Sequence, residues 1–394
     1  MANGLGYGRN APEFRRASLA LFFAGFATFS MIYCVQSLLP EFTRSFDISP
    51  ATASLALSVT TGSLALAILL SGALALSVGR RALIFVSIIL AALCNLATVL
   101  AWDWHLFLLA RAGEGFLLGG VPAIAMVYLA EEIDPRDLGR ATGLYVAGTA
   151  GGAMLGRLGM GAVADFASWR LAMALLGVIC MGAAICFLCL IPPSRRFSPR
   201  RGAGIAQHAK VWAGLLRDQE MLKLYVAGFA LTSIFVTVFS YSTFRLSEPP
   251  FRLSPFLTSL IFLTYGLGMV SSSTGGQMID RWGHRNMLIV SFVLMALGIA
   301  ITLSDNLVAV VLGISIVTIG FFTGHSCTSS AVAVRSAELR SHSTALYLVF
   351  YYLGASVIGT AGGAVWEVAG WLGIVLLGTA FCAMGVFVAS VSAR

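Results

Sequence analysis

The sequence predicts an all-α integral membrane protein with twelve transmembrane helices in two pseudo-symmetric six-helix bundles. Three observations lead to this prediction: the hydropathy of the chain, an internal repeat and the distribution of basic residues. The chain is 58 % hydrophobic and only 11 % charged, whereas a soluble domain carries about 25 % charged residues. Because a bilayer offers no water to backbone polar groups, apolar runs of about 20 residues form helices.

Twelve apolar runs divide the chain, separated by short charged, proline- or glycine-containing segments. The predicted spans are 18–39, 51–77, 82–101, 105–129, 140–163, 170–191, 222–244, 255–278, 286–303, 307–330, 343–365 and 370–391. The longest polar segment follows the sixth run, begins with two prolines and contains several arginines, a composition typical of a linker. We therefore predict an N-terminal bundle over 1–191, a cytoplasmic linker over 192–220 and a C-terminal bundle over 221–394.

Two sequence patterns recur about half a chain apart. The spacing Gly-x(6)-Gly-x-Arg occurs at Gly72, Gly79 and Arg81 and again, 204 residues later, at Gly276, Gly283 and Arg285. Segment 141–145 aligns with 343–347 at an offset of 202, and the same offset pairs Gly152 with Gly354 and Trp169 with Trp371. Two nearly equal offsets indicate two like-oriented halves.

Basic residues fall mostly on one side of the predicted spans. With the N-terminus in the cytoplasm, nineteen lie on the inner side and only four on the outer side, namely Arg44, Arg170, Arg245 and Arg252. Positive charge marks cytoplasmic loops, so both termini are predicted to be cytoplasmic. The net charge of +8 is then explained by topology, and no nucleic-acid partner is expected.

Motifs for other kinds of chemistry are missing from the sequence. It has no phosphate-binding loop followed by Lys-Ser/Thr, no zinc-ligand spacing and no Ser/His/Asp set in a polar setting. The seven cysteines all fall in predicted helices, where packing is their expected role. We expect no catalysis, no metal and no cofactor. An intramembrane enzyme, a channel and a receptor remain competing classes at this point.

Three charged residues lie well inside predicted helices: Arg111, Glu114 and Arg157. Charges inside a bilayer are costly and need partners. One interpretation is a structural ion pair, with Arg157 pairing with Glu114 or capping carbonyl groups. The other is a protonatable carboxylate between two guanidiniums, which takes up a proton when they move apart. The three charges sum to +1, which leaves room for an anionic substrate.

At these residues the chain resembles the major facilitator superfamily. The second repeat copy matches the superfamily loop between helices 2 and 3, with Gly276, Asp280, Arg281, Gly283 and Arg285. The first copy has Leu76 and Ser77 in place of the acidic and basic residues. Two further patterns are similar to those of helices 4 and 5, at Arg111–Gly115 and at Gly148, Gly152 and Gly156, although Ala153 and Arg157 depart from the helix 5 antiporter motif.

Segments 33–40, 128–132, 345–347 and 351–354 are similar to the YnfM-like branch of bacterial efflux-type permeases. This resemblance implies a transporter of the bacterial cytoplasmic (inner) membrane that works by alternating access and is powered by the proton gradient. It favours efflux of a small organic molecule, with an uptake symporter as the alternative. The expected partners are the small-molecule substrate and the lipid bilayer, and the expected state is a monomer.

The resemblance also implies roles for individual residues. Loop charges of this superfamily pair across the two halves when the cytoplasmic side is closed, so the gating set comprises Gly72, Gly79, Arg80, Arg81, Arg140, Gly276, Asp280, Arg281, Gly283 and Arg285. Since helices 1, 4, 7 and 10 line the central path, the substrate-cavity candidates are Tyr33, Gln36, Ser240, Tyr241 and, on helix 11, Tyr351. His325 is either a structural histidine or a second proton site.

Overall fold

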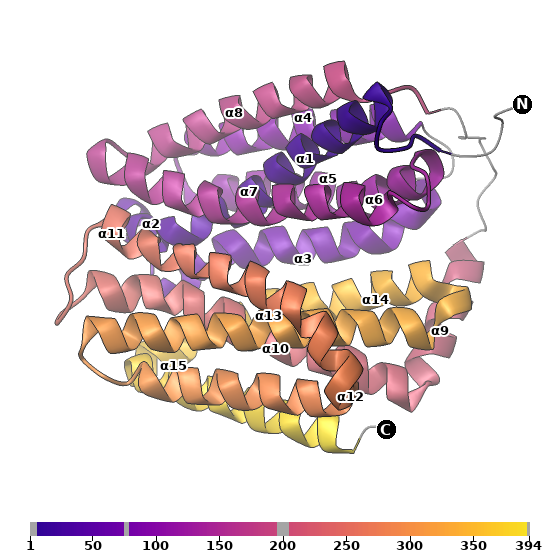
Figure 1. Cartoon of the computed structure of the whole chain (residues 1–394). Coiled ribbons are helices and arrows are strands. Elements are labelled where there is room, and N and C mark those ends of the chain that lie inside the picture. Colours follow the sequence, from indigo (N-terminus) through magenta and orange to yellow (C-terminus); the bar gives the residue numbers. More distant parts are fainter. Residues whose placement is uncertain (1–5, 75–78, 195–204, 392–394) are drawn as a thin grey trace, which may run out of the picture.

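The computed structural model describes residues 6–74, 79–194 and 205–391. These residues form helices joined by short turns, with one isolated β-bridge between Tyr7 and Ile133. Figure 1 shows two stacked groups of helices, one from each half of the chain. The predicted all-α membrane fold is confirmed.

The N-terminal group contains six spans, four of which are single helices. The first span is divided by a 3₁₀ segment, η1, and the fourth is divided at Gly119 and Gly120. The elements in chain order are α1 (Pro12–Tyr33), η1 (Cys34–Leu38), α2 (Leu39–Phe46), α3 (Pro50–Leu74), α4 (Arg80–Val99), α5 (Trp104–Leu118), α6 (Val121–Glu132), α7 (Leu138–Phe166) and α8 (Trp169–Leu190).

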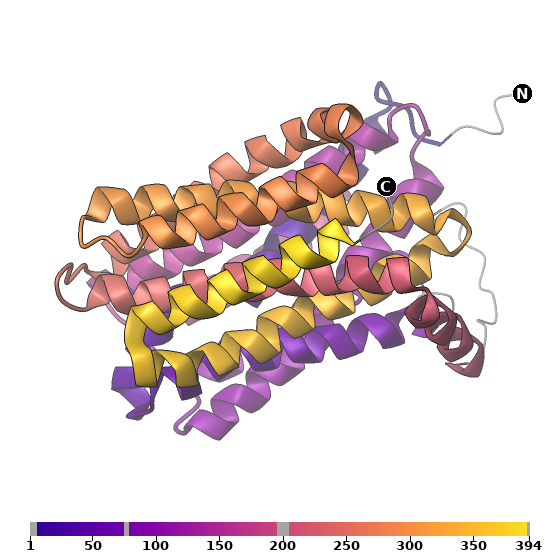
Figure 2. The same ribbon diagram turned by 90° about the horizontal axis from the view of Figure 1, so that it is seen from below.

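The C-terminal group follows a short connecting helix, α9 (Ile205–Arg217). Figure 2 shows α9 at the same end of the molecule as the N- and C-terminal ends of the chain. The remaining elements are α10 (Gln219–Ser247), α11 (Pro255–Ser259), η2 (Leu260–Thr264), α12 (Tyr265–Ile301), α13 (Leu307–Arg335), η3 (Ala337–Leu339), α14 (Arg340–Leu353), the π-helical η4 (Gly354–Ile358) and α15 (Gly359–Ser390).

Two long elements each turn back on themselves at a glycine. Gly283 in α12 has φ 77° and Gly370 in α15 has φ 55°, values that glycine adopts at little cost because it has no Cβ. Ten stretches of the described chain are long and apolar enough to span a membrane, and one of them, Arg340–Ser390, contains the turn at Gly370. Helix α7 is less apolar because of its many glycines, but it runs the length of the group beside α1.

The internal repeat recurs in the packing. A Cβ at Gly152 of α7 would collide with the carbonyl oxygen of Phe26 in α1, and a Cβ at Gly354 would collide with that of Phe229 in α10. The two glycines are the pair that the sequence repeat aligns. Each half therefore uses the same small residue to bring its fifth span against its first.

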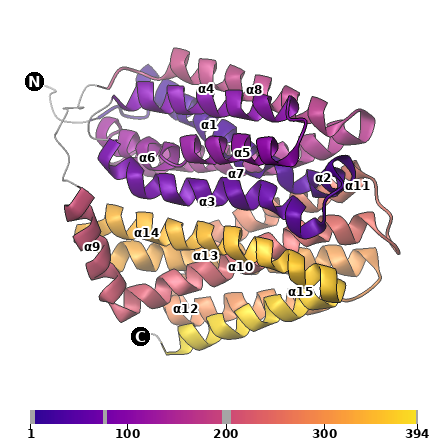
Figure 3. The same ribbon diagram turned by 180° about the vertical axis from the view of Figure 1, so that it is seen from behind.

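The two groups meet along α3 with α14, η4 and α15, and along α7 with α11 and η2; Figure 3 shows the first of these contacts. Ser356 Oγ donates to Ser58 O at 2.7 Å. Nearer one end, Ser254 Oγ donates to Asp165 Oδ2 at 2.8 Å, and the Ala51 N–H donates to Glu367 Oε1 at 3.2 Å. The positive-inside pattern of the sequence predicts that the end of the molecule with these two contacts faces the outside. Within the described residues, the hydrogen bonds between the groups lie from here to the middle of the spans.

Candidate functional site: two buried arginines on either side of a broken helix

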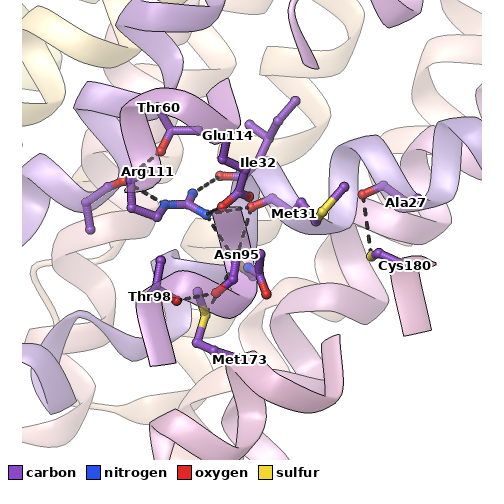
Figure 4. A network of polar contacts seen from close by, with 12 residues as sticks. Ala27, Met31, Ile32, Thr60, Asn95, Thr98, Arg111, Glu114, Met173 and Cys180 are labelled. Carbon is purple, nitrogen blue, oxygen red and sulfur yellow. Dashed lines mark hydrogen bonds and ion pairs between the residues drawn. The ribbon is translucent and has the colours of Figure 1, made fainter. Parts of the chain in front are cut away.

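Arg111 and Glu114 lie on the same face of α5, one turn apart. Helix α5 begins at Trp104, directly after the N-cap residue Asp103, whose side chain accepts hydrogen bonds from the backbone N–H groups of His105 and Leu106. Eight residues after Asp103, Arg111 Nη1 contacts Glu114 Oε2 at 2.7 Å, and both side chains are fully buried. The pair is shown in Figure 4.

The Arg111 guanidinium also binds the backbone where α1 changes to η1. It donates to Met31 O at 3.1 Å, to Ile32 O at 3.0 Å and to Ala56 O of α3 at 3.3 Å. A change from α to 3₁₀ winding interrupts the regular hydrogen-bond ladder, so carbonyl groups at the junction need other donors. Arg111 supplies them, and its charge is balanced by Glu114.

Glu114 has one oxygen that is not engaged. Oε2 accepts from Arg111, whereas Oε1 has no hydrogen-bond partner among the described residues. The side chain of Asn95 from α4 lies beside the carboxylate. A buried carboxylate with a free oxygen can accept a proton without losing the contact made by its other oxygen.

Arg157 on α7 has a different set of partners. Its Nε donates to Gln36 Oε1 at 2.8 Å, and its Nη1 donates to Ala153 O, one turn earlier, at 2.6 Å. The guanidinium lies 4.4 Å from the ring centroid of Tyr33, 5.0 Å from that of Phe262 and 4.8 Å from that of Tyr265. No carboxylate of the described residues lies within ion-pair distance of it.

One sequence interpretation is therefore corrected. It placed Glu114 between two guanidiniums, but in this conformation Arg111 carries the only guanidinium of the described residues that lies within ion-pair distance of Glu114. Arg157 caps a carbonyl group, which was the other alternative for this residue. The two arginines contact the same short segment of chain. Arg111 contacts Met31 and Ile32, whereas Arg157 contacts Tyr33 and Gln36.

All five cavity candidates lie where the two groups of helices meet. Gln36 Nε2 donates to Ser240 Oγ of α10 at 3.0 Å, so the amide links Arg157 to the opposite half. Tyr33 covers Arg157 and contacts Tyr351 of the opposite half. Tyr241 donates to Gly359 O at 2.9 Å within the C-terminal group and also lies beside Ser54 of α3.

Tyr351 and His325 share an aromatic cluster. The two rings lie 5.0 Å apart, and the His325 ring stacks on Phe321. His325 Nδ1 lies 2.8 Å from the Tyr347 hydroxyl. His325 thus has a hydrogen-bond partner, as the structural interpretation of this histidine requires.

Two predicted gating arginines bind within their own half. Arg80 begins α4 directly after Gly79, the N-cap residue, and forms an ion pair with Glu131 of α6 at 2.9 Å. Arg81 Nη2 donates to Leu188 O of α8 at 2.8 Å. Both of these partners belong to the N-terminal half.

The second copy of the gating motif lies in α12 of the C-terminal group. Gly283 and Arg285 line a pocket of about 930 Å³ together with Trp282, Cys327 and Arg335. Arg140 and Arg281 are exposed, as expected where the two halves are apart. Gly72 and Gly276 lie in helices α3 and α12, but the side chain of Asp280 and the loop residues Leu76 and Ser77 lie outside the described part of the chain.

The sequence analysis missed Asn95, Glu131, Phe262 and Tyr265. Phe262 and Tyr265 lie on the eighth span, and the search for cavity residues was confined to spans 1, 4, 7, 10 and 11. A signal was available, because a lone arginine in an apolar helix is often covered by aromatic rings. Glu131 was noted only as part of the family resemblance, whereas a buried Arg80 would have required such a partner.

Two repeated helical groups that meet over buried charges define a multi-pass membrane protein of the transporter class. The sequence profile described as Major Facilitator Superfamily matches residues 21–359. The chain belongs to this superfamily.

Curated relatives cover most of the chain. It is 40 % identical to the "Uncharacterized MFS-type transporter YybF" of Bacillus subtilis (strain 168), over 93 % of this chain and 91 % of the relative. It is 36 % identical to the "Inner membrane transport protein YnfM" of Escherichia coli (strain K12), over 93 % and 88 %. A solved bacterial homolog of the human lysosomal transporter Spinster, inward-facing and occupied, has the same fold, with TM-score 0.80 at 13 % identity over 97 % of this chain and 98 % of that one.

Proposed function

We propose that this protein is a secondary active transporter that exports a small organic solute in exchange for protons. It acts as a monomer in the bacterial cytoplasmic membrane, with both termini on the inner side. The observation that carries the proposal is the buried Arg111–Glu114 pair, whose carboxylate keeps one oxygen free of hydrogen bonds. Export rather than uptake rests on the sequence resemblance alone.

Alternating access follows from where the two groups of helices touch. Their hydrogen bonds run from the outer end, at Ser254 and Asp165, to the middle, at Ser356 and Ser58. The exposed Arg140 and Arg281 lie at the other end. In our proposal this is the conformation open to the cytoplasm, and the outward-open conformation breaks the outer contacts while the gating charges pair.

Glu114 is the proposed proton carrier. Protonation removes its negative charge and weakens its attraction to Arg111. Arg111 also donates to Met31 O and Ile32 O, so a change at Glu114 is passed to the α1–η1 junction. That junction holds Gln36, which binds Ser240 of the other half. The proton site is thereby connected to the contact between the halves.

The test separates exchange from proton-driven transport in proteoliposomes. A panel of labelled organic solutes is screened for saturable counterflow, and the same solutes are then driven by a pH jump. Glu114→Gln is permanently neutral, so it should keep counterflow and lose the response to the pH jump. Glu41→Gln is the matched control, because Glu41 forms the same i,i+3 pair with Arg44 at 2.8 Å but at the surface.

Each result of this test is informative. Counterflow by no solute contradicts a transporter. Full pH-driven flux in Glu114→Gln contradicts the role of this carboxylate. The sign of the flux under an imposed gradient decides between export and the uptake alternative.

A further inference from the structure

Arg157 carries a buried positive charge that no carboxylate of the described residues neutralises. Its side chain is about as inaccessible as that of Arg111, with only 1 % of the residue exposed. Arg111 has Glu114, but the partners of Arg157 are an amide oxygen, a carbonyl oxygen and three aromatic rings. A buried charge without an opposite charge is costly, and charged residues retained inside a membrane protein usually serve function.

Within the described residues, the guanidinium has N–H donors without an acceptor as well as a positive charge without a counter-charge. It carries five N–H bonds, and in the described chain two of its nitrogens each donate to one acceptor, Gln36 Oε1 and Ala153 O. Among the residues that the structure describes, none accepts a hydrogen bond from Nη2. A planar carboxylate is the group that fits the remaining donors, since it accepts two parallel N–H bonds from a guanidinium.

The neighbouring side chains indicate what the carboxylate is attached to. The rings of Tyr33, Phe262 and Tyr265 make the walls around the guanidinium predominantly apolar. One cation among aromatic walls suits an anion with a single charge and an apolar or aromatic body. A phosphate, with nearly two charges, would leave negative charge unbalanced.

We infer that Arg157 binds the carboxylate of an organic anion, and that this anion belongs to the substrate class of the transporter proposed above. Phe262 and Tyr265 come from the opposite half of the molecule. Their rings cover the guanidinium in the present conformation and take the place of the anion. A cation–π contact is weaker than a buried ion pair, so the carboxylate displaces the rings when it binds.

The experiment uses three probes with the same ring and different charge. Benzoate, benzamide and benzylammonium are titrated at neutral pH into the full-length protein in detergent, with the unfolding temperature and calorimetric heat as readouts. Benzoate alone should bind. Arg157→Gln should abolish its binding and Arg157→Lys should weaken it about tenfold or more, because lysine cannot form the paired bonds.

Two further variants separate this inference from a loss of folding. Phe262→Leu removes one covering ring at similar volume, so benzoate should bind several-fold tighter than to the wild type. Arg170→Gln is the matched control, since Arg170 also lies over an aromatic ring, that of Trp169 at 4.2 Å, but is exposed at the outer end. Its benzoate affinity should equal that of the wild type.

The inference is overturned if the wild type does not bind benzoate, if benzamide binds equally well, or if folded Arg157→Gln keeps its benzoate affinity. Should Arg157→Gln fail to fold, an unchanged or weaker affinity of Phe262→Leu overturns it. Because binding is measured in detergent, it does not depend on flux. If benzoate binding depends on Arg157 but no solute shows counterflow, the proposed transport is rejected and the anion site is retained. If only neutral solutes show counterflow, the anion site is rejected and the proposed transport is retained.

Discussion

Arg111 and Arg157 are both buried arginines of the N-terminal half, yet their surroundings differ in the one respect that decides their roles. Arg111 has a carboxylate at 2.7 Å and three backbone carbonyls within 3.3 Å. Arg157 has an amide, one carbonyl and aromatic faces. The comparison teaches that burial alone does not make a charge structural. A charge satisfied by the fold stabilises the fold, whereas an unsatisfied one is available to a ligand.

The largest expected effect is on Arg111. Arg111→Gln leaves Glu114 buried without its counter-charge and removes donors from Met31 O and Ile32 O, so we expect a loss of about 3–5 kcal/mol of stability. Thermal unfolding in detergent measures it. Adding Glu114→Gln should restore part of the loss, because the unpaired carboxylate is then gone. If Arg111→Gln alone is as stable as the wild type, the distinction between Arg111 and Arg157 is contradicted.

Gln36 links the unsatisfied arginine to the other half. Gln36→Leu removes the acceptor of Arg157 and the donor to Ser240, and a hydrogen bond to a charged group is worth about 2 kcal/mol. The unfolding temperature should fall accordingly. Ser240→Ala loses only the neutral bond and should cost about half as much. Equal losses would mean that the charge of Arg157 adds nothing to the bond from Gln36.

For Arg157 the comparison predicts little or no loss of stability, in contrast to Arg111. Without ligand, Arg157→Gln should unfold within about 1 kcal/mol of the wild type or at a higher temperature, since replacing an uncompensated buried charge is neutral or favourable. The same unfolding assay compares it with Arg111→Gln. A loss as large as that of Arg111→Gln would make Arg157 a structural residue.

The smallest effect is expected where an ion pair is exposed. Arg335 Nη2 lies 3.5 Å from Asp218 Oδ1, and both side chains are more than 40 % exposed. Arg335→Gln should therefore cost less than about 1 kcal/mol. Such a result would confirm that the contribution of an arginine's ion-pair partner to stability increases with burial.

This exposed pair also has a pH dependence. Burial is the largest single influence and opposes ionisation of Asp218, but the N–H groups of Met221 and Glu220 and the charge of Arg335 together outweigh it and lower the pKa. The stability it contributes is present above about pH 4, the usual pKa of an aspartate, and is lost as the pH falls through the lowered value. Asp218→Asn, which can still cap α10, should be insensitive over that range in the same unfolding assay.

Local spacing accounts for the parts of the site that were predictable. Arg111 and Glu114 are three residues apart on one helix, so their contact follows from helix geometry. The partners of Arg157 that are distant in sequence come from α1, η1, η2 and α12, and only the packing of these elements brings them together. Ala153, four residues before Arg157, was the one partner within reach of a local argument.

The fold was predictable to a similar extent. Hydropathy and the glycine repeat predicted the twelve spans, although α1 begins at Pro12 rather than at residue 18. The 3₁₀ segment at Cys34–Leu38 and the π-helical one at Gly354–Ile358 were not predicted. Both occur where a span contacts the opposite half, so their cause lies in neighbours that are distant in sequence.

The unequal pairing of the two arginines also has an electrical consequence. The buried side chains Arg111, Glu114 and Arg157 carry a net charge of +1, and a monovalent anion at Arg157 reduces this to zero. A unit charge that crosses the full membrane potential gains or loses about 2.3 kcal/mol per 100 mV. In the proposed cycle, the membrane potential therefore acts more strongly on the protein without the anion as it reorients than on the protein with the anion bound.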